Sequence, residues 1–231
     1  MKNTALAVFA ILICCHDACS QNNKWTVKAG EDIKTSIPDS IKFRYPHFVP
    51  GYVYFKNGKI SVASLNYNLS NGEMQFITQG MDTLSIDDEV TISLIKINND
   101  SFYFDKVYME LIAGNGAVKL AKKESLGIGD VEKIGAYDQA SSISAISTIG
   151  YFHNSNGEVT KLNVRNNLVL LKRTLYYIGD SYNHFLPVNK KNVIKIFGRK
   201  QNEVENFLTE NKIAFNKEDD LKKLITFLQK I

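Results

Sequence analysis

Residues 51–77 have the sequence GYVYFKNGKISVASLNYNLSNGEMQFI, and this stretch decides the fold. Apolar and polar residues alternate in it, as in ISVA at 60–63, which is the period-two pattern of a half-buried β-strand. Its apolar runs are separated by Asn-Gly at 57–58 and at 71–72. Asn-Gly accepts the positive φ angles of the type I′ turn, whose twist matches that of the flanking strands. The stretch therefore predicts short strands joined in antiparallel order by tight turns.

The same pattern continues over residues 46–188, where Asn-Gly recurs between apolar runs at 115–116 and 156–157. We expect an antiparallel β domain over 46–188, mainly β, whose meander forms either a sandwich or a partial barrel. The Gly-rich stretch 127–139 has no clear period, so we expect a loop there. The expected strands are 51–56, 59–67, 73–78, 90–97, 101–104, 107–112, 117–121, 143–152, 159–164, 168–177 and 184–188.

The last part of the chain, residues 189–231, changes its period from two to about 3.6. We expect a small C-terminal helical element that covers an edge or a face of the sheet. Asn189 is expected to cap a first short helix, which Gly198 ends. Asn216 is expected to cap the last helix, whose apolar residues recur at helical spacing over 221–228.

The first residues, 1–20, predict a secretory signal peptide. Lys2 is followed by an apolar run at 5–15 and by small residues at 18–20 that suit signal peptidase. All three cysteines lie here, so the processed chain would carry no thiol; the alternative is a lipoprotein with one cysteine acylated. Residues 21–45 are polar and are expected to form an irregular lead-in. We expect an exported protein, periplasmic or associated with the outer membrane, with no transmembrane segment after processing.

The composition is that of an ordinary globular chain: of 231 residues, 44% are hydrophobic and 23% charged, and the formal net charge is +4. These values exclude disordered, collagen-like and multi-span membrane proteins and give no ground for nucleic-acid binding. Positive charge is concentrated in 189–231, with ten Lys or Arg against six Asp or Glu. Five cations crowd the first expected helix and its exit: Lys190, Lys191, Lys195, Arg199 and Lys200.

This basic cluster is a candidate contact for an anionic surface, such as lipid headgroups or acidic glycans. The simpler interpretation is a solvated helix face, in which the last cations suit the helix dipole. We favour the simpler interpretation.

The sequence shows no catalytic or metal-binding constellation. The histidines after the signal segment, His47, His153 and His184, have no second ligand at a metal-binding spacing. No G-x-S-x-G elbow occurs, and the processed chain has no cysteine nucleophile. The acidic run 87–89 lacks the spacing of a calcium loop and predicts a turn. We expect neither a metal nor a cofactor.

The segments Phe55-x-x-Gly58, LNYN at 65–68, EMxFI at 73–77, NKKN at 189–192, Phe197 and DDLxxL at 219–224 occur together in this chain. This combination resembles a group of exported, functionally uncharacterised proteins of Bacteroidetes-type bacteria. The resemblance covers most of the chain after the signal segment and implies export to the envelope, with no named activity. In such bacteria Asp-Ser/Thr followed by an apolar residue is an O-glycosylation signal. The resemblance therefore implies modification at Ser40 and Thr83, although three-residue patterns also arise by chance.

These observations favour a non-enzymatic protein of the cell envelope that binds a protein partner or a surface glycan. The alternative is a hydrolase acting on glycans, with an acidic pair that the sequence does not identify. Such a pair would face each other across a cleft at roughly 5–10 Å. A third hypothesis is a structural envelope protein held at the membrane by the basic helix. The sequence does not predict an oligomeric state.

Overall fold

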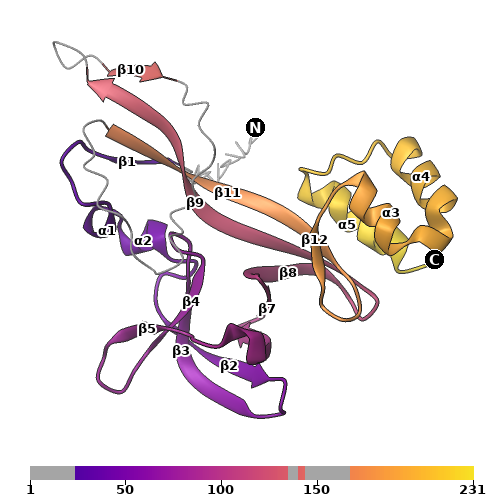
Figure 1. Cartoon of the computed structure of the whole chain (residues 1–231), viewed down its shortest axis with the longest axis horizontal. Helices are drawn as coiled ribbons and strands as arrows, with labels where there is room; N and C mark the ends of the chain where they lie inside the picture. Colours follow the sequence, from indigo (N-terminus) through magenta and orange to yellow (C-terminus); the bar gives the residue numbers. More distant parts are fainter. Residues whose placement is uncertain (1–23, 135–139, 144–166) are drawn as a thin grey trace, which may run out of the picture.

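The computed structural model describes residues 24–134, 140–143 and 167–231. The predicted signal peptide, the expected strand 159–164 and nearly all of the expected strand 143–152 lie outside the described residues. Figure 1 shows a long curled sheet with a group of helices at one end. The strands are β1 (Lys24–Val27), β2 (Val49–Phe55), β3 (Ile60–Asn68), β4 (Glu73–Ile77), β5 (Thr83–Ser85), β6 (Ile92–Ile97), β7 (Asp100–Asp105), β8 (Val107–Asn115), β9 (Val118–Ile134), β10 (Ala140–Ile143), β11 (Asn167–Gly179) and β12 (Phe185–Pro187).

The helices fall into two groups, one near each end of the chain. The first pair is short, and the second group follows the last strand. Their bounds are α1 (Ile33–Ser36), α2 (Asp39–Lys42), α3 (Lys190–Ile196), α4 (Gln201–Glu210) and α5 (Glu218–Leu228), with 3-10 turns at η1 (Glu89–Thr91) and η2 (Gly198–Lys200).

The strands pair in the order β1-β11-β9-β8-β7-β6-β2-β3-β4-β5, with β10 against β9 and β12 against β11. All of the described pairings are antiparallel. The hairpins form at Asn57-Gly58 and Asn71-Gly72 as expected, but the type I′ turn is wrong: Gly58 and Gly72 have φ angles of 85° and 74°, whereas Asn57 and Asn71 do not have positive φ angles. The predicted mainly β meander is confirmed. It curls into a half-barrel. Of the two alternatives that the sequence left open, a sandwich and a partial barrel, the structure has the partial barrel.

The expected loop at 127–139 is wrong for its first half, because β9 continues to Ile134, pairing with β11 as far as Glu132 and with β10 over 131–134. The glycines that suggested a loop make room for side chains of the partner strand instead. A Cβ on Gly129 would lie 2.3 Å from Cδ1 of Leu171, and one on Gly127 would lie 3.2 Å from Nε of Arg173. The two glycines thus allow the long β9–β11 ribbon to remain paired.

The segment 21–45 is not irregular in its described part. β1 pairs with β11, and α1 and α2 follow it closely. Ile33 and Ile37 are at most 7% exposed and belong to the main hydrophobic core, together with Leu65 and Phe102 of the sheet. The apolar residues of this segment are too widely spaced to give a periodic signal, yet they close one side of the core.

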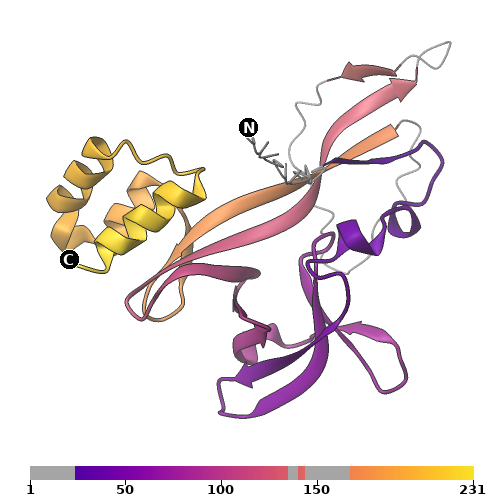
Figure 2. The ribbon, with the colours of Figure 1, turned by 180° about the vertical axis from the view of Figure 1, so that it is seen from behind.

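The predicted C-terminal helical element is present and packs on one end of the sheet (Figure 2). Asn189 caps α3 as expected, since its Oδ1 accepts a hydrogen bond of 2.9 Å from the backbone N–H of Asn192. The last helix begins one residue after Lys217, which occupies the N-cap position expected for Asn216. Its apolar face packs into a second core with β8 and β9; the buried residues are Leu221, Leu224, Ile225 and Leu228.

We expect Gly129→Ala to lower the free energy of unfolding by roughly 1–3 kcal/mol, because the new Cβ would overlap the side chain of Leu171. Urea-induced unfolding followed by circular dichroism measures this change. Gly198→Ala is the matched control, since a Cβ there meets no atom within 4 Å. The double variant Gly129→Ala with Leu171→Ala should lose less than the sum of the two single changes. A neutral Gly129→Ala would return this stretch to the loop interpretation.

Candidate functional site

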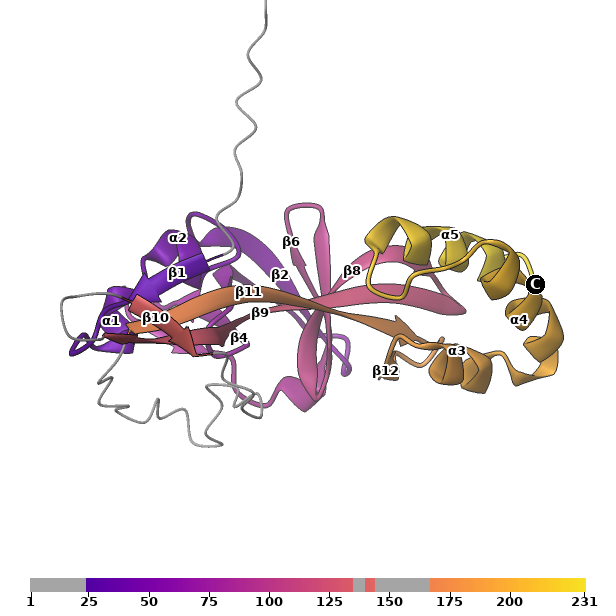
Figure 3. The same ribbon diagram turned by 90° about the horizontal axis from the view of Figure 1, so that it is seen from above.

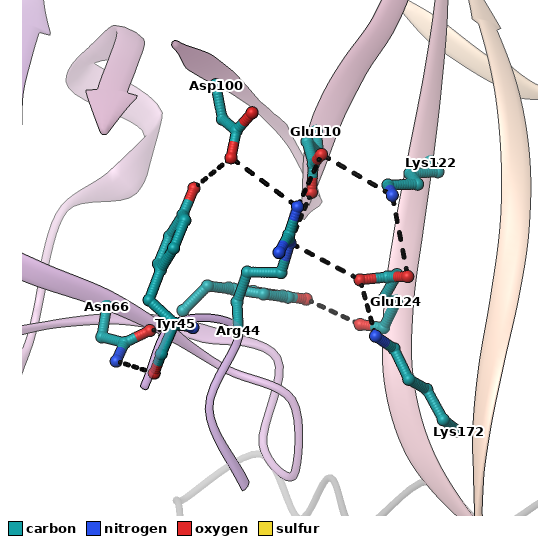
Figure 4. Close-up of polar contacts among 9 residues, drawn as sticks. Arg44, Tyr45, Asn66, Asp100, Glu110, Lys122, Glu124 and Lys172 are labelled. Carbon is teal, nitrogen blue, oxygen red and sulfur yellow. Dashed lines mark hydrogen bonds and ion pairs between the residues drawn. The ribbon is translucent and has the colours of Figure 1, made fainter. Parts of the chain in front are cut away.

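Six charged side chains gather where the lead-in segment crosses the sheet (Figure 4). We call this group the Arg44 cluster; it comprises Arg44, Asp100, Glu110, Lys122, Glu124 and Lys172. Arg44 follows α2, and the other members come from β7, β8, β9 and β11. Strand register brings them together, because Glu110 lies opposite Lys122, and Glu124 is two residues further along the same face of β9.

Arg44 and Glu110 form the strongest contact of the cluster. Nε of Arg44 lies 3.0 Å from Oε2 of Glu110, and Nη2 lies 3.2 Å from Oε1, so that the pair is bidentate. This hydrogen bond to Glu110 raises the pKa of Arg44 further above its usual range. The side chains of Glu110 and Glu124 are only 11% and 12% exposed. Solvent therefore screens these charges less than it screens an ordinary surface ion pair.

A layer of neutral polar groups holds the backbone beside Arg44. The hydroxyl of Tyr45 donates to Oδ2 of Asp100 at 2.6 Å, and burial raises the pKa of Tyr45. The buried amide of Asn66 accepts from the backbone N–H of Tyr45 at 3.1 Å and donates to its carbonyl oxygen at 2.9 Å. Arg44 itself donates through its backbone N–H to the carbonyl oxygen of Tyr67 at 2.9 Å. These bonds attach the lead-in segment to β3 and fix the origin of the Arg44 side chain.

The charges of the Arg44 cluster balance, since three carboxylates face three cations. Lys122 lies 3.6 Å from Glu110 and 3.7 Å from Glu124, and Lys172 lies 3.2 Å from Glu124. Each carboxylate lies within 4 Å of at least one cation, and Arg44 contacts all three. The arrangement fits a clamp between the lead-in segment and the sheet better than it fits an acid–base pair.

A cleft of about 710 Å³ opens between β8 and β9; its β9 residues Lys123 and Ser125 alternate with Lys122 and Glu124 of the Arg44 cluster and so face the other side of the strand. Its lining mixes charged, amide and hydroxyl groups with apolar and aromatic side chains, as ligand pockets do. We call it the β8–β9 cleft; its lining residues are Leu69, Ser70, Asn71, Gly72, Glu73, Glu89, Phe104, Lys106, Val107, Lys123, Ser125, Leu126 and Tyr177.

The cleft exists because β8 and β9 part from each other. Their pairing starts at Glu110 opposite Lys122 and runs towards the hairpin turn, so that the earlier residues of β8 do not pair with β9. The turn between β3 and β4 enters the gap, and the backbone N–H of Leu126 donates to the carbonyl oxygen of Leu69 at 2.8 Å. Strand separation followed by loop insertion therefore creates a concave site from residues of five strands and three turns.

Two buried polar atoms of that inserted turn have no hydrogen-bond partner among the described residues. The hydroxyl of Ser70 and Oδ1 of Asn71 are buried, and neither has a hydrogen-bond partner in the part of the chain that the structure describes. On its other side Asn71 donates from Nδ2 to Oε2 of Glu73 at 2.6 Å, and the hydroxyl of Ser85 also donates to Glu73. Buried polar atoms normally find a partner, so such an atom in a cleft indicates a place where a ligand or water binds.

Burial affects two further groups, Lys123 in the lining of the cleft and Tyr108 in the adjoining strand β8, whose side chain belongs to the main core. Burial lowers the pKa of the Lys123 ammonium. Burial also raises the pKa of the Tyr108 hydroxyl, and the charges of Glu89 and Glu73 raise it further. That hydroxyl is buried and has no hydrogen-bond partner among the described residues. The cleft is therefore a partly desolvated environment, in which each added hydrogen bond has a larger effect than at the surface.

The five residues of the basic cluster lie in α3 and η2, among the C-terminal helices, and none of them lines this cleft. Lys190 lies 3.6 Å from Glu205, and Lys200 lies 2.9 Å from Glu203. The remaining three, Lys191, Lys195 and Arg199, are exposed. Two of the five positive charges are thus paired with glutamates of α4, which agrees with a solvated helix face. The contact with an anionic surface stays a prediction.

The other residues singled out from the sequence are dispersed. Ser40 lies in α2 and Thr83 in β5, both exposed, and modification there stays a prediction. His184 is exposed, with Nδ1 3.4 Å from Asp180, and His153 lies outside the described residues.

The acidic run 87–89 forms the expected turn, but its last residue, Glu89, also lines the β8–β9 cleft. Nothing in the sequence distinguishes Ser70 and Asn71 as site residues, because Asn71-Gly72 has a sufficient explanation as a turn.

Comparisons with protein-family models, with curated proteins and with solved structures found no match. Within residues 24–134, 140–143 and 167–231, no group of three or more His, Asp or Glu side chains is placed to hold a metal ion. None of the described helices has the length and apolar character needed to cross a membrane.

We expect Arg44→Met to lower the free energy of unfolding by roughly 2–4 kcal/mol, because it removes one cation from carboxylates that are shielded from solvent. Urea-induced unfolding at neutral pH measures the loss. Arg199→Met is the matched control: this exposed arginine has no ion pair among the described residues, so its removal should change stability by less than about 0.5 kcal/mol. Equal effects at the two positions would argue against the clamp.

Proposed function

We propose that this chain is an exported, non-enzymatic binding module of the cell envelope, and that it binds a glycan in the β8–β9 cleft. The observation that carries the proposal is the pair of unpartnered polar atoms, Ser70 Oγ and Asn71 Oδ1, on a turn that lines a cleft of about 710 Å³. A ligand that donates hydrogen bonds to both would satisfy them.

A saccharide matches the lining better than a purely apolar or a purely ionic ligand. Its hydroxyls both donate and accept, and the lining offers carboxylates (Glu73 and Glu89) as acceptors and ammonium groups (Lys106 and Lys123) as donors. Its apolar ring faces pack well on aromatic rings, and Phe104 lines the same cleft. This chemistry supports the glycan among the two kinds of partner that the sequence favoured.

Binding fits the acidic residues of the cleft better than catalysis does. Glu73 already accepts hydrogen bonds from Asn71 and Ser85 of its own chain, which fix its orientation. The carboxylates of the neighbouring Arg44 cluster are held by cations. Binding needs only such fixed acceptors, whereas hydrolysis of a glycosidic bond needs a protonated acid that faces a second carboxylate.

The alternative function, a glycan-directed hydrolase, is favoured by one observation: Glu73 and Glu89 line the same cleft. Incubation of each bound saccharide with the protein, followed by chromatography, tests this. Cleavage that disappears in Glu73→Gln and in Glu89→Gln would establish the hydrolase and overturn the non-enzymatic proposal.

The proposal is tested on the full chain as purified from cells, first with an array of immobilised oligosaccharides and then by titration calorimetry with the strongest one. We expect Ser70→Ala to weaken binding roughly 3–10-fold, the effect of one neutral hydrogen bond. Its stability should stay within about 0.5 kcal/mol of the parent, because the Ser70 hydroxyl has no hydrogen-bond partner among the described residues.

Ser181→Ala is the matched control, since Ser181 is exposed in the turn after β11, away from the cleft, and should bind like the parent. A folded protein that binds no saccharide of the array, or equal binding by Ser70→Ala and the parent, would contradict the proposal.

A further inference from the structure

The first half of β3 has an open outer edge. β3 pairs with β2 along Ile60–Leu65, but its pairing with β4 begins only at Ser64, opposite Ile77. No described strand lies against residues 60–63 on that side. We call this stretch the β3 edge; Figure 1 shows the β2–β3 hairpin diverging there from the hairpin of β4 and β5.

The backbone groups of the β3 edge point outwards at alternate residues. The carbonyl oxygen of Lys59 accepts from the backbone N–H of Phe55 in β2 at 2.9 Å, so odd-numbered residues of β3 direct their backbone groups towards β2. At the far end of the strand, Asn68 accepts from Gly72 on the β4 side, which agrees with this alternation. Ile60 and Val62 therefore present two N–H and two C=O groups to an added strand.

An apolar groove of about 570 Å³ lies beside this edge, between the two diverging hairpins. Ser61 and Ala63 of β3 line one side, and Phe76 of β4 lines the other. The groove exposes part of the main core, so that an apolar side chain placed there would bury surface of both hairpins. Its residues are Val53, Phe55, Ser61, Val62, Ala63, Leu65, Phe76, Ile77, Thr78, Gln79, Ile86 and Asp87.

The β3 edge lacks the features with which proteins prevent unwanted strand pairing. Residues 60–63 contain no proline and no charge, and the register with β2 shows no bulge. Ile60 and Val62 are 59% and 65% exposed, which is unusual for β-branched aliphatic residues on a strand. An open, uncharged edge beside an apolar groove is the arrangement to which extended peptides add as strands.

The charges around the edge are positive. Lys59 directly precedes it, Lys56 lies across the hairpin turn, and Lys96 lies in one row with Tyr52 and Val62 across β6, β2 and β3. All three lysines are exposed, and the described residues give none of them an ion pair. Asp87 is the one acidic residue of the groove.

We propose that an extended peptide segment of a partner protein, with apolar and acidic residues in alternation, adds to the sheet as a strand antiparallel to β3. Its apolar side chains would enter the groove beside Ser61 and Ala63. Its carboxylates would lie on the other face, beside Ile60 and Val62, which is the face that carries Lys96; Lys59, directly before the edge, adds positive charge at its start. Pairing with a second copy would bring two sets of lysines together, and residues 60–63 of that copy would supply no carboxylate. This inference does not depend on glycan binding in the β8–β9 cleft.

The experiment uses the full chain and a fluorescein-labelled peptide of sequence Glu-Val-Glu-Val-Glu-Val, with binding measured by fluorescence anisotropy. We expect saturable binding, and slower hydrogen exchange at the amides of Ile60 and Val62 in the complex. Val62→Pro removes one outward N–H that the fold does not use and should weaken binding at least tenfold. Lys59→Glu with Lys96→Glu should also weaken it roughly tenfold.

Three controls separate strand addition from adhesion to a basic protein. Lys195→Glu, an exposed lysine in α3, should bind the peptide like the parent. The same peptide methylated on alternate backbone nitrogens keeps its charge and apolar side chains but loses ladder donors, so it should bind at least tenfold more weakly in one of the two methylation registers. The charge-inverted peptide Lys-Val-Lys-Val-Lys-Val should bind the parent more weakly and the Lys59→Glu, Lys96→Glu variant more tightly.

Two results would overturn the proposal. One is binding that depends on charge alone: both methylated peptides bind like the unmodified peptide, Lys195→Glu weakens binding as much as Lys59→Glu with Lys96→Glu does, and the Ile60 and Val62 amides are not protected. The other is a dimer of the chain in analytical ultracentrifugation that Val62→Pro dissociates, together with no peptide binding; the occupant would then be a second copy. Glycan binding by Val62→Pro should equal that of the parent, so failure here leaves the cleft proposal to its own test.

Discussion

The pairing of β9 with β11 is the interaction on which the rest of the structure depends (Figure 3). It extends from Glu132 opposite Asn167 to Lys119 opposite Gly179, with one register shift. β1 and β12 occupy separate parts of the outer edge of β11, β8 adds to β9, and α5 packs against β8 and β9. The two larger hydrophobic cores of the described residues lie at different positions along this ribbon, one with the lead-in segment and one with the C-terminal helices. Elements far apart in sequence are thus held together because each of them contacts β9 or β11.

A ribbon of this length has a strong right-handed twist, and a third strand follows it over only part of its length. β8 leaves β9 at the pair formed by Glu110 and Lys122, and these two residues belong to the Arg44 cluster. The cluster therefore lies where the sheet opens and stabilises strands that backbone hydrogen bonds no longer hold. Beyond it the turn after β3 fills the gap incompletely, which leaves the β8–β9 cleft. The same geometric misfit that requires the ion pairs also creates the candidate ligand site.

Local patterns were sufficient to predict the hairpins, the antiparallel order and the C-terminal helices, because each depends on neighbours in sequence. Gly127 and Gly129 suggest a loop when only the sequence is considered. Glycine is required there because the side chains of Arg173 and Leu171, on another strand, occupy the space that a Cβ would need. The Arg44 cluster has the same character: its members are isolated charges in sequence and meet only through strand register. Ser70 was not predicted, since nothing local distinguishes a serine whose hydroxyl is unpartnered from one at an ordinary turn. The sequence thus predicts local structure well and sites assembled across strands poorly.

Both proposed sites arise where pairing in the sheet is incomplete, and they differ in which groups are left free. In the β8–β9 cleft the free groups are side-chain oxygens of Ser70 and Asn71, which suit a ligand with many hydroxyls. At the β3 edge they are backbone groups at the spacing of a strand, which only another strand can match. The two sites share one element, since β3 starts at the edge and ends at the turn that carries Ser70. A change at either end of β3 can therefore reach the other through the strand itself, and measuring both ligands on every variant is what separates a local loss of contact from a displaced strand.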